Sequence, residues 1–185
     1  MFLITGCGRS GTKYTSKVLQ ACGLDIRHEA IGKDGAVSSI WALEAEKYVG
    51  RHARGSRSMF DVVLHQVRHP LQAIASMTTA RPESIKWVEE NTNQKYTGDI
   101  IKWTSEHWLY WNILCEKQAV ITYRVEAMRE AWTAISNILG INVPFPAGIP
   151  TNINTRKHMT LSWEEIANHT DRVDLIRSKA TEYGY

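Results

Sequence analysis

Short apolar runs alternate with longer segments of helical periodicity along this chain. Runs at residues 2–5, 61–67 and 119–123 predict strands, and "LDIRHE" at 24–29 predicts another strand, which ends at His28 and Glu29. Helical spacing of apolar residues predicts helices that begin near residue 11 and over 37–49, 71–77, 82–92, 98–117, 126–139 and 170–182. Strands that alternate with helices predict an α/β fold of three layers, α/β/α, with a central parallel sheet like that of P-loop NTPases.

Local signals mark the ends of several of these elements. Pro70 suits the first turn of a helix, and Ser162 with Glu165 forms the pattern of a capping box. The basic segment "RHARGSR" at 51–57 and the proline-rich segment "INVPFPAGIP" at 141–150 predict loops. No internal repeat or linker interrupts the pattern, so we expect one domain over residues 1–185.

Polar residues gather where the predicted strands end, at residues 6–12, 28–29, 68–76 and 123–126. In a parallel sheet, ligands bind beyond the carboxyl ends of the strands. The four polar segments are therefore predicted to meet in one binding site.

The first of these segments, in "ITGCGRSGTKYT" at 4–15, resembles a nucleotide-binding P-loop without matching it. Gly6 and Gly11 have the P-loop spacing, but Thr12 stands where the lysine is expected, and Arg9 lies inside the loop. The backbone N–H groups of such a loop and the following helix N-terminus attract an anion. Hydroxyls of Ser10 and Thr12 and the permanent charge of Arg9 predict a site for phosphate or sulfate.

Longer motifs resemble those of the sulfotransferase family. "TGCGRSGT" followed by "GLDIRHE" resembles the family's 5′-phosphosulfate loop, particularly in the bacterial and tyrosylprotein-type branch with an R-S-G-T core. "VRHPLQAIAS" resembles the 3′-phosphate signature, in which an arginine and a serine stand eight positions apart, here Arg68 and Ser76. "YRVEAM" and "NTRKH" resemble two looser elements, and the matches span residues 3–163.

The resemblance implies a donor, 3′-phosphoadenosine 5′-phosphosulfate (PAPS), and a role for each matching residue. Glu29 is the implied general base and His28 its rival, while Arg9 stabilises charge on the bridging oxygen. Lys13, where the family usually has threonine, either reaches the 5′-phosphate or faces solvent. The implied donor-binding residues are Gly8, Arg9, Ser10, Gly11, Thr12, Lys13, Arg68, Ser76, Arg156 and Lys157.

The implied reaction is a metal-independent, in-line transfer of the sulfuryl group to a hydroxyl, which leaves 3′,5′-adenosine bisphosphate. The acceptor stays open between a sugar, a lipid, a small alcohol or phenol, and a peptide tyrosine. Trp103, Trp108 and Trp111 have helical spacing, which predicts core positions, with the acceptor pocket as the alternative.

Composition limits the kinds of ligand and the cellular compartment that we expect for this chain. A net charge of +3 over 185 residues fits a small anionic ligand and does not call for nucleic acid. Three cysteines without paired spacing are typical of a reducing compartment, so the cytoplasm is expected. No apolar run reaches the ~18 residues of a membrane span.

Two other functions remain open from the sequence. A P-loop kinase or NTPase is disfavoured because the lysine comes one place late, as Lys13. It also needs a magnesium-binding aspartate at the end of a strand, but in the strand at 61–67 the aspartate, Asp61, comes first and Arg68 follows the last residue. A non-catalytic module would keep the nucleotide site without the base or the acceptor pocket.

Overall fold

A five-stranded parallel sheet forms the centre of the chain. A computed structural model describes residues 1–43, 57–153 and 156–185. The sheet has the strand order β2-β3-β1-β4-β5, and every neighbouring pair is parallel. The strands are β1 (Phe2–Thr5), β2 (Ile26–His28), β3 (Gly35–Val37), β4 (Val62–Val67) and β5 (Ile121–Arg124).

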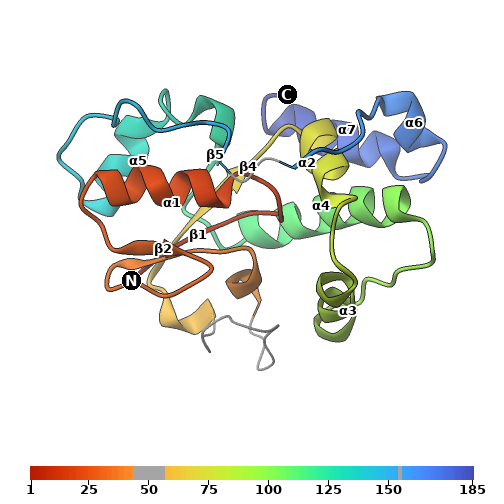
Figure 1. The fold of residues 1–185 in the computed structure, drawn as a ribbon, viewed down its shortest axis with the longest axis horizontal. Helices are drawn as coiled ribbons and strands as arrows, with labels where there is room; N and C mark the ends of the chain where they lie inside the picture. The colour runs from red at the N-terminus through yellow and green to blue at the C-terminus, as the bar shows by residue number, and fades with distance from the viewer. Residues whose placement is uncertain (44–56, 154–155) are drawn as a thin grey trace.

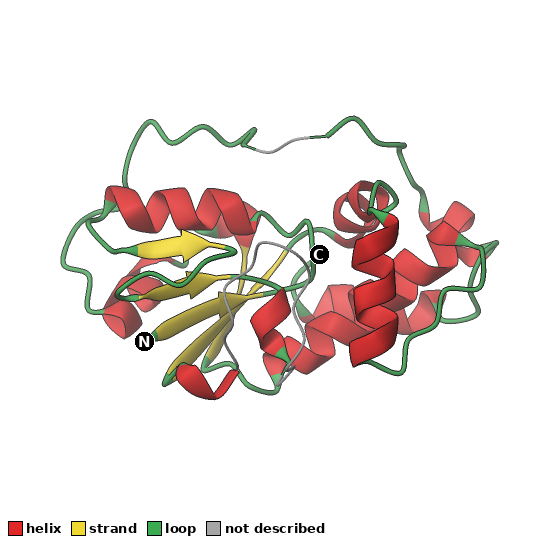
Figure 2. Cartoon of the chain, turned by 60° about the horizontal axis from the view of Figure 1, so that its bottom comes forward, coloured by secondary structure: helices red, strands yellow, loops and turns green. Residues whose placement is uncertain are grey.

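Seven α-helices flank this sheet within the described residues. Figure 1 shows α1 and α5 along one side of the sheet and α4 along the other, while Figure 2 shows the strands side by side and a separate cluster of helices. No helix in the described ranges has both the length and the apolar character needed to cross a bilayer. The helices are α1 (Thr12–Ala21), α2 (Pro70–Met77), α3 (Pro82–Asn91), α4 (Ile100–Glu116), α5 (Trp132–Leu139), α6 (Trp163–Ala167) and α7 (Val173–Glu182).

Both faces of the sheet are buried, which explains why its strands are mostly apolar rather than alternating. Ile4 and Leu64 pack with Val18 of α1 and Ile135 of α5. Leu3, on the opposite face, packs with buried side chains before and within β4. The three-layer α/β/α fold predicted from the sequence is therefore confirmed.

The sequence did not predict β3 (Gly35–Val37), and its last residue, Val37, was assigned to a helix over 37–49. Val37 ends strand β3, and a short 3-10 helix follows at Ile40–Ala42, while residues 44–49 lie outside the described residues. Three residues are too few to show a strand pattern. Gly35 has a φ of 150°, and an added Cβ would lie 2.0 Å from the carbonyl oxygen of Phe2. Close pairing with β1, which the sequence does not display, therefore fixes this strand.

One further segment differs from the prediction, and another lies mostly outside the described residues. The helix expected over 126–139 is a 3-10 helix at Val125–Ala127 followed by α5, which begins only at Trp132. Of the basic segment at 51–57, only Arg57 is described, and it begins a 3-10 helix at Arg57–Met59. The predicted proline-rich loop contains no helix or strand.

The capping box before α6 gives a prediction for stability. Ser162 Oγ accepts a hydrogen bond from the Glu165 backbone N–H at 3.2 Å, and the Ser162 N–H donates to Glu165 Oε2 at 2.6 Å. Ser162→Ala is expected to lower the free energy of unfolding by about 1 kcal/mol. Thermal denaturation should show a drop in melting temperature of about 2–4 °C. Ser178→Ala, at an exposed position inside α7, is the matched control and should not lower it.

Candidate functional site

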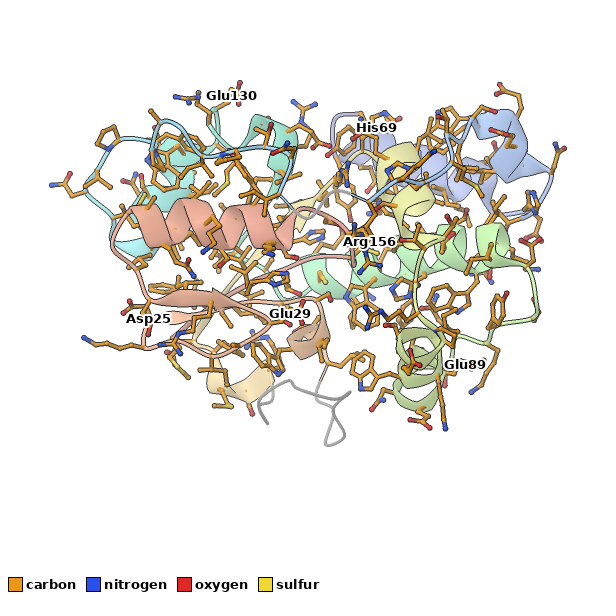
Figure 3. All side chains as sticks on the ribbon, viewed as in Figure 1. Asp25, Glu29, His69, Glu89, Glu130 and Arg156 are labelled. Carbon is orange, nitrogen blue, oxygen red and sulfur yellow. The ribbon has the colours of Figure 1, made fainter. Side chains whose placement is uncertain are left out.

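A cavity of about 510 Å³ lies at the carboxyl ends of the strands. Its volume is within the range of roughly 300–1,000 Å³ that small-molecule sites occupy. Figure 3 shows Glu29 and Arg156 near the middle of the molecule, between α1 and α3. The cavity is lined by Gly8, Arg9, Gly11, Thr12, Lys13, Tyr14, His28, Glu29, Ser39, Arg68, Gln72, Ser76, Val125, Glu126, Thr151, Ile153, Arg156 and His158. All four polar segments that follow the predicted strands therefore contribute to it.

The loop between β1 and α1 has an unusual backbone that exposes it to the cavity. Gly11 has a φ of 84°, and Arg9 has a φ of 67°. Arg9 and Glu29 are the non-glycine residues with positive φ in the described parts of the chain, and both line the cavity. Such strained residues gather at ligand sites. An added Cβ at Gly8 would meet no atom within 4 Å, so a ligand has room to approach the backbone there.

Side chains from the sheet hold this loop in place. The Gln66 amide in β4 donates to the Ser10 carbonyl at 2.6 Å and accepts from the Tyr123 hydroxyl at 3.3 Å. Arg68 Nη1 donates to the Arg9 carbonyl at 3.0 Å. Gln66 and its neighbour His65 are polar residues in a strand that is otherwise Val and Leu, and this is the signal that could have identified Gln66.

The N-terminus of α1 adds positive potential to the cavity. Gly11 is its N-cap, no side chain caps the helix, and its first turn contains no acidic residue. The positive end of the helix dipole is therefore not neutralised by the helix itself. Thr12 and Lys13 of this turn line the cavity, and Lys13 is exposed. Ser10 does not line it: this side chain is fully buried, and its hydroxyl has no hydrogen-bond partner among the described residues.

A second group of anion-binding side chains follows β4. Arg68 Nη2 donates to Gln72 Oε1 at 3.1 Å, one helical turn into α2. Ser76, further along α2, accepts a hydrogen bond from Arg9 Nε at 2.9 Å. The Arg9 side chain therefore reaches from the loop to the second group, a link that the sequence analysis did not predict. The spacing of Arg68 and Gln72 is a helical signal that could have identified Gln72.

Arg156 brings a third guanidinium to the cavity, whereas Lys157 does not line it. Arg156 Nη1 donates to the Thr79 carbonyl at 3.2 Å. Burial lowers the pKa of Arg9, and the charges of Arg156 and Arg68 lower it further. Three positive charges that disfavour one another around one cavity indicate that it is suited to an anion.

His28 and Glu29 bring titratable groups to the end of β2. His28 Nε2 lies 3.0 Å from Thr12 Oγ1 and 3.9 Å from Glu29 Oε1. The Ser38 hydroxyl donates to Glu29 Oε2 at 3.2 Å. Both candidate bases therefore face the cavity beside the loop. Ser38 directly follows β3, so its role was missed together with that strand.

The three tryptophans of α4 belong to the core rather than to the cavity. Trp103, Trp108 and Trp111 are buried, with exposed fractions of 6%, 0% and 1%. Trp111 Nε1 donates to the carbonyl of Ser39 at 3.2 Å, which ties α4 to the cavity wall. The core position that their spacing predicted is therefore confirmed.

Comparisons with protein-family models, curated proteins and solved structures found no match to this chain. The function proposed for it therefore rests on the cavity and on the chemistry of the residues around it.

Proposed function

We propose that this chain is a sulfotransferase that moves a sulfuryl group from PAPS to the hydroxyl of an acceptor. One observation carries the proposal: two groups of anion-binding residues, the loop before α1 and the group at Arg68 and Ser76, open into one cavity. A nucleotide with phosphates at both its 5′ and 3′ ends uses both groups. ATP has its phosphates at one end only and leaves the second group without a ligand.

The donor would be held by complementary charge and by backbone N–H groups. Gly8, Gly11 and Thr12 would bind the 5′-phosphosulfate, and Lys13 is near enough to the loop to add its charge. Arg68 and Ser76 would hold the 3′-phosphate, the arginine as a fork of donors.

Arg156 and the other two cavity arginines would supply most of the positive charge around the donor. The Arg9 side chain is bonded to Ser76 and lies between the two groups. It can therefore serve either end of the donor.

Glu29 is the proposed general base. The bond from sulfur to the bridging oxygen breaks, a bond from sulfur to the acceptor oxygen forms, and Glu29 takes the acceptor's proton. Its Oε2 accepts a hydrogen bond from the Ser38 hydroxyl, which fixes the carboxylate beside the cavity. His28 is the rival base, but its Nε2 contacts the Thr12 hydroxyl.

Arg68 supports a sulfuryl donor over a magnesium nucleotide. It stands directly after β4, where a P-loop NTPase commonly has a metal-binding carboxylate, and a guanidinium repels a cation. The free thiols Cys7, Cys22 and Cys115 are compatible with a reducing compartment, so we propose the cytoplasm as its location.

Thermal denaturation with and without ligand tests this proposal. Adenosine 3′,5′-bisphosphate at about 100 times its Kd, without metal, is expected to add ~2.7 kcal/mol of stability. For a domain of this size, that corresponds to a rise in melting temperature of roughly 5–10 °C. AMP, which lacks the 3′-phosphate, should give a clearly smaller rise at the same concentration.

The matched variant is Arg68→Gln. It should reduce the rise in melting temperature with the bisphosphate to nearly the rise that AMP gives. A rise with magnesium ATP and none with the bisphosphate would contradict the proposal and favour a kinase or NTPase. No rise with either nucleotide would also contradict it.

A further inference from the structure

The residues after α7 pack against the turn between β4 and α2. The Tyr185 hydroxyl donates to Glu126 Oε2 at 2.7 Å, and its ring meets the His69 ring edge-on, with centroids 5.2 Å apart. The Tyr185 backbone N–H donates to the Ala180 carbonyl at 3.0 Å. Figure 1 shows the C-terminal segment beside the start of α2. One side chain thus joins α7 to the loops that follow β4 and β5.

Glu126 connects this contact to the backbone of the turn. Its Oε1 accepts a hydrogen bond from the His69 backbone N–H at 2.9 Å, and its other oxygen accepts from Tyr185. His69 is the N-cap of α2, and Pro70 after it has no N–H. The His69 amide is therefore a backbone donor at this helix start, and it is held by Glu126, which lines the cavity.

Arg124 holds Tyr185 from the other side. Its guanidinium lies over the Tyr185 ring, 5.6 Å from the centroid, and its Nη1 donates to the Gly184 carbonyl. Burial raises the pKa of Tyr185, and the hydrogen bond to the Glu126 carboxylate raises it further. The hydroxyl therefore stays protonated and keeps donating at neutral pH.

We propose that Tyr185 and Glu126 are positioning residues for the second anion group, and that they act by fixing the turn that carries Arg68. We call Tyr185, Glu126 and His69 the Tyr185 latch. Arg68 directly precedes His69, and its fork is already aimed by the Arg9 carbonyl and Gln72. Because a shift of about 1 Å in a positioned binding group can greatly weaken a site, the turn that carries Arg68 must be held firmly.

The ligand expected at the second anion group rests on the proposed function. The first experiment uses no ligand, so its result does not depend on that function. Amide hydrogen exchange at His69 is compared between the unchanged chain and Tyr185→Phe, which keeps the ring contacts. Loss of a hydrogen bond to a charged group should speed His69 exchange by about tenfold. Unchanged exchange at His69 would overturn the latch.

The second experiment measures the Kd of adenosine 3′,5′-bisphosphate and of AMP. Tyr185→Phe should raise the Kd of the bisphosphate by about tenfold and leave that of AMP within twofold. A purely structural role would raise both together, and an unchanged ratio of the two Kd values would overturn the proposal.

Tyr183→Phe is the matched control for this series. It also removes a hydroxyl that donates to a glutamate, Glu116, but this pair lies outside the cavity. Its ratio of Kd values should equal that of the unchanged chain. If the unchanged chain binds no bisphosphate, the proposed function fails, and His69 exchange alone decides whether the latch exists.

Discussion

Replacing Glu29 with Gln is expected to slow the proposed sulfuryl transfer by about 10²–10⁴-fold, the usual contribution of a positioned general base. The amide has the shape of the carboxylate, and its oxygen can still accept from the Ser38 hydroxyl. It lacks the basicity to take a proton. Donor affinity should not fall, because removing a negative charge from a cavity with three arginines favours an anion.

The measurement is the transfer rate from PAPS to whichever acceptor, among sugars, phenols and tyrosine peptides, reacts fastest with the unchanged chain. The Kd of the bisphosphate is measured alongside it. His28→Gln is the paired variant, because it removes the rival base and its contact with Thr12.

If His28→Gln abolishes transfer and Glu29→Gln does not, the histidine is the base. If turnover and donor binding both survive Glu29→Gln unchanged, the role proposed for Glu29 is wrong.

Gly6→Ala is expected to give a large loss of stability. Gly6 directly follows β1, and a Cβ there would lie 2.1 Å from the carbonyl oxygen of Gln66 in the neighbouring strand. Since the atom that the Cβ would meet belongs to the Gln66 backbone, no side chain can move aside to make room. The strand or the loop must shift, and the hydrogen bond from the Gln66 amide to Ser10 would be strained with it. We expect a loss of about 3 kcal/mol or more in the free energy of unfolding.

Urea and thermal denaturation measure this loss, which corresponds to a drop in melting temperature of roughly 6–12 °C. Gly8→Ala is the control in the same loop, because its Cβ would meet nothing within 4 Å. That variant should be as stable as the unchanged chain or slightly more stable, since alanine restricts the unfolded state. Equal losses in the two variants would show that close packing at Gly6 is not the cause.

The sequence was sufficient to predict the layers of the fold and the edge of the sheet at which the candidate site lies. A buried parallel strand is mostly apolar, and short apolar runs at 2–4, 62–64 and 119–121 lie in or directly before β1, β4 and β5. The polar residues that follow them then share one edge of the sheet, whatever the exact bounds of the helices. This is why the loop at Arg9, the pair at His28 and Glu29, and the group at Arg68 were expected to meet.

Features that depend on tertiary contacts were not predictable. β3 exists because Gly35 allows close pairing with Phe2, and three residues carry no periodicity. Ser10 was expected to face the ligand, but the turn of the loop buries it. The bond between Arg9 and Ser76 depends on how far one rotatable side chain reaches, which spacing alone does not reveal.

The arrangement of the cavity at four strand ends also has a kinetic consequence. Among the described strands, β5 pairs only with β4, and residues far apart in sequence must meet before Val125 and Glu126 reach the loop before α1. Such non-local pairings form slowly and only as the sheet is completed. A folding transition state without docked β5 therefore has no complete cavity. If β5 docks after the barrier, the proposed nucleotide would stabilise contacts that form only then, so it would slow unfolding and leave the folding rate nearly unchanged.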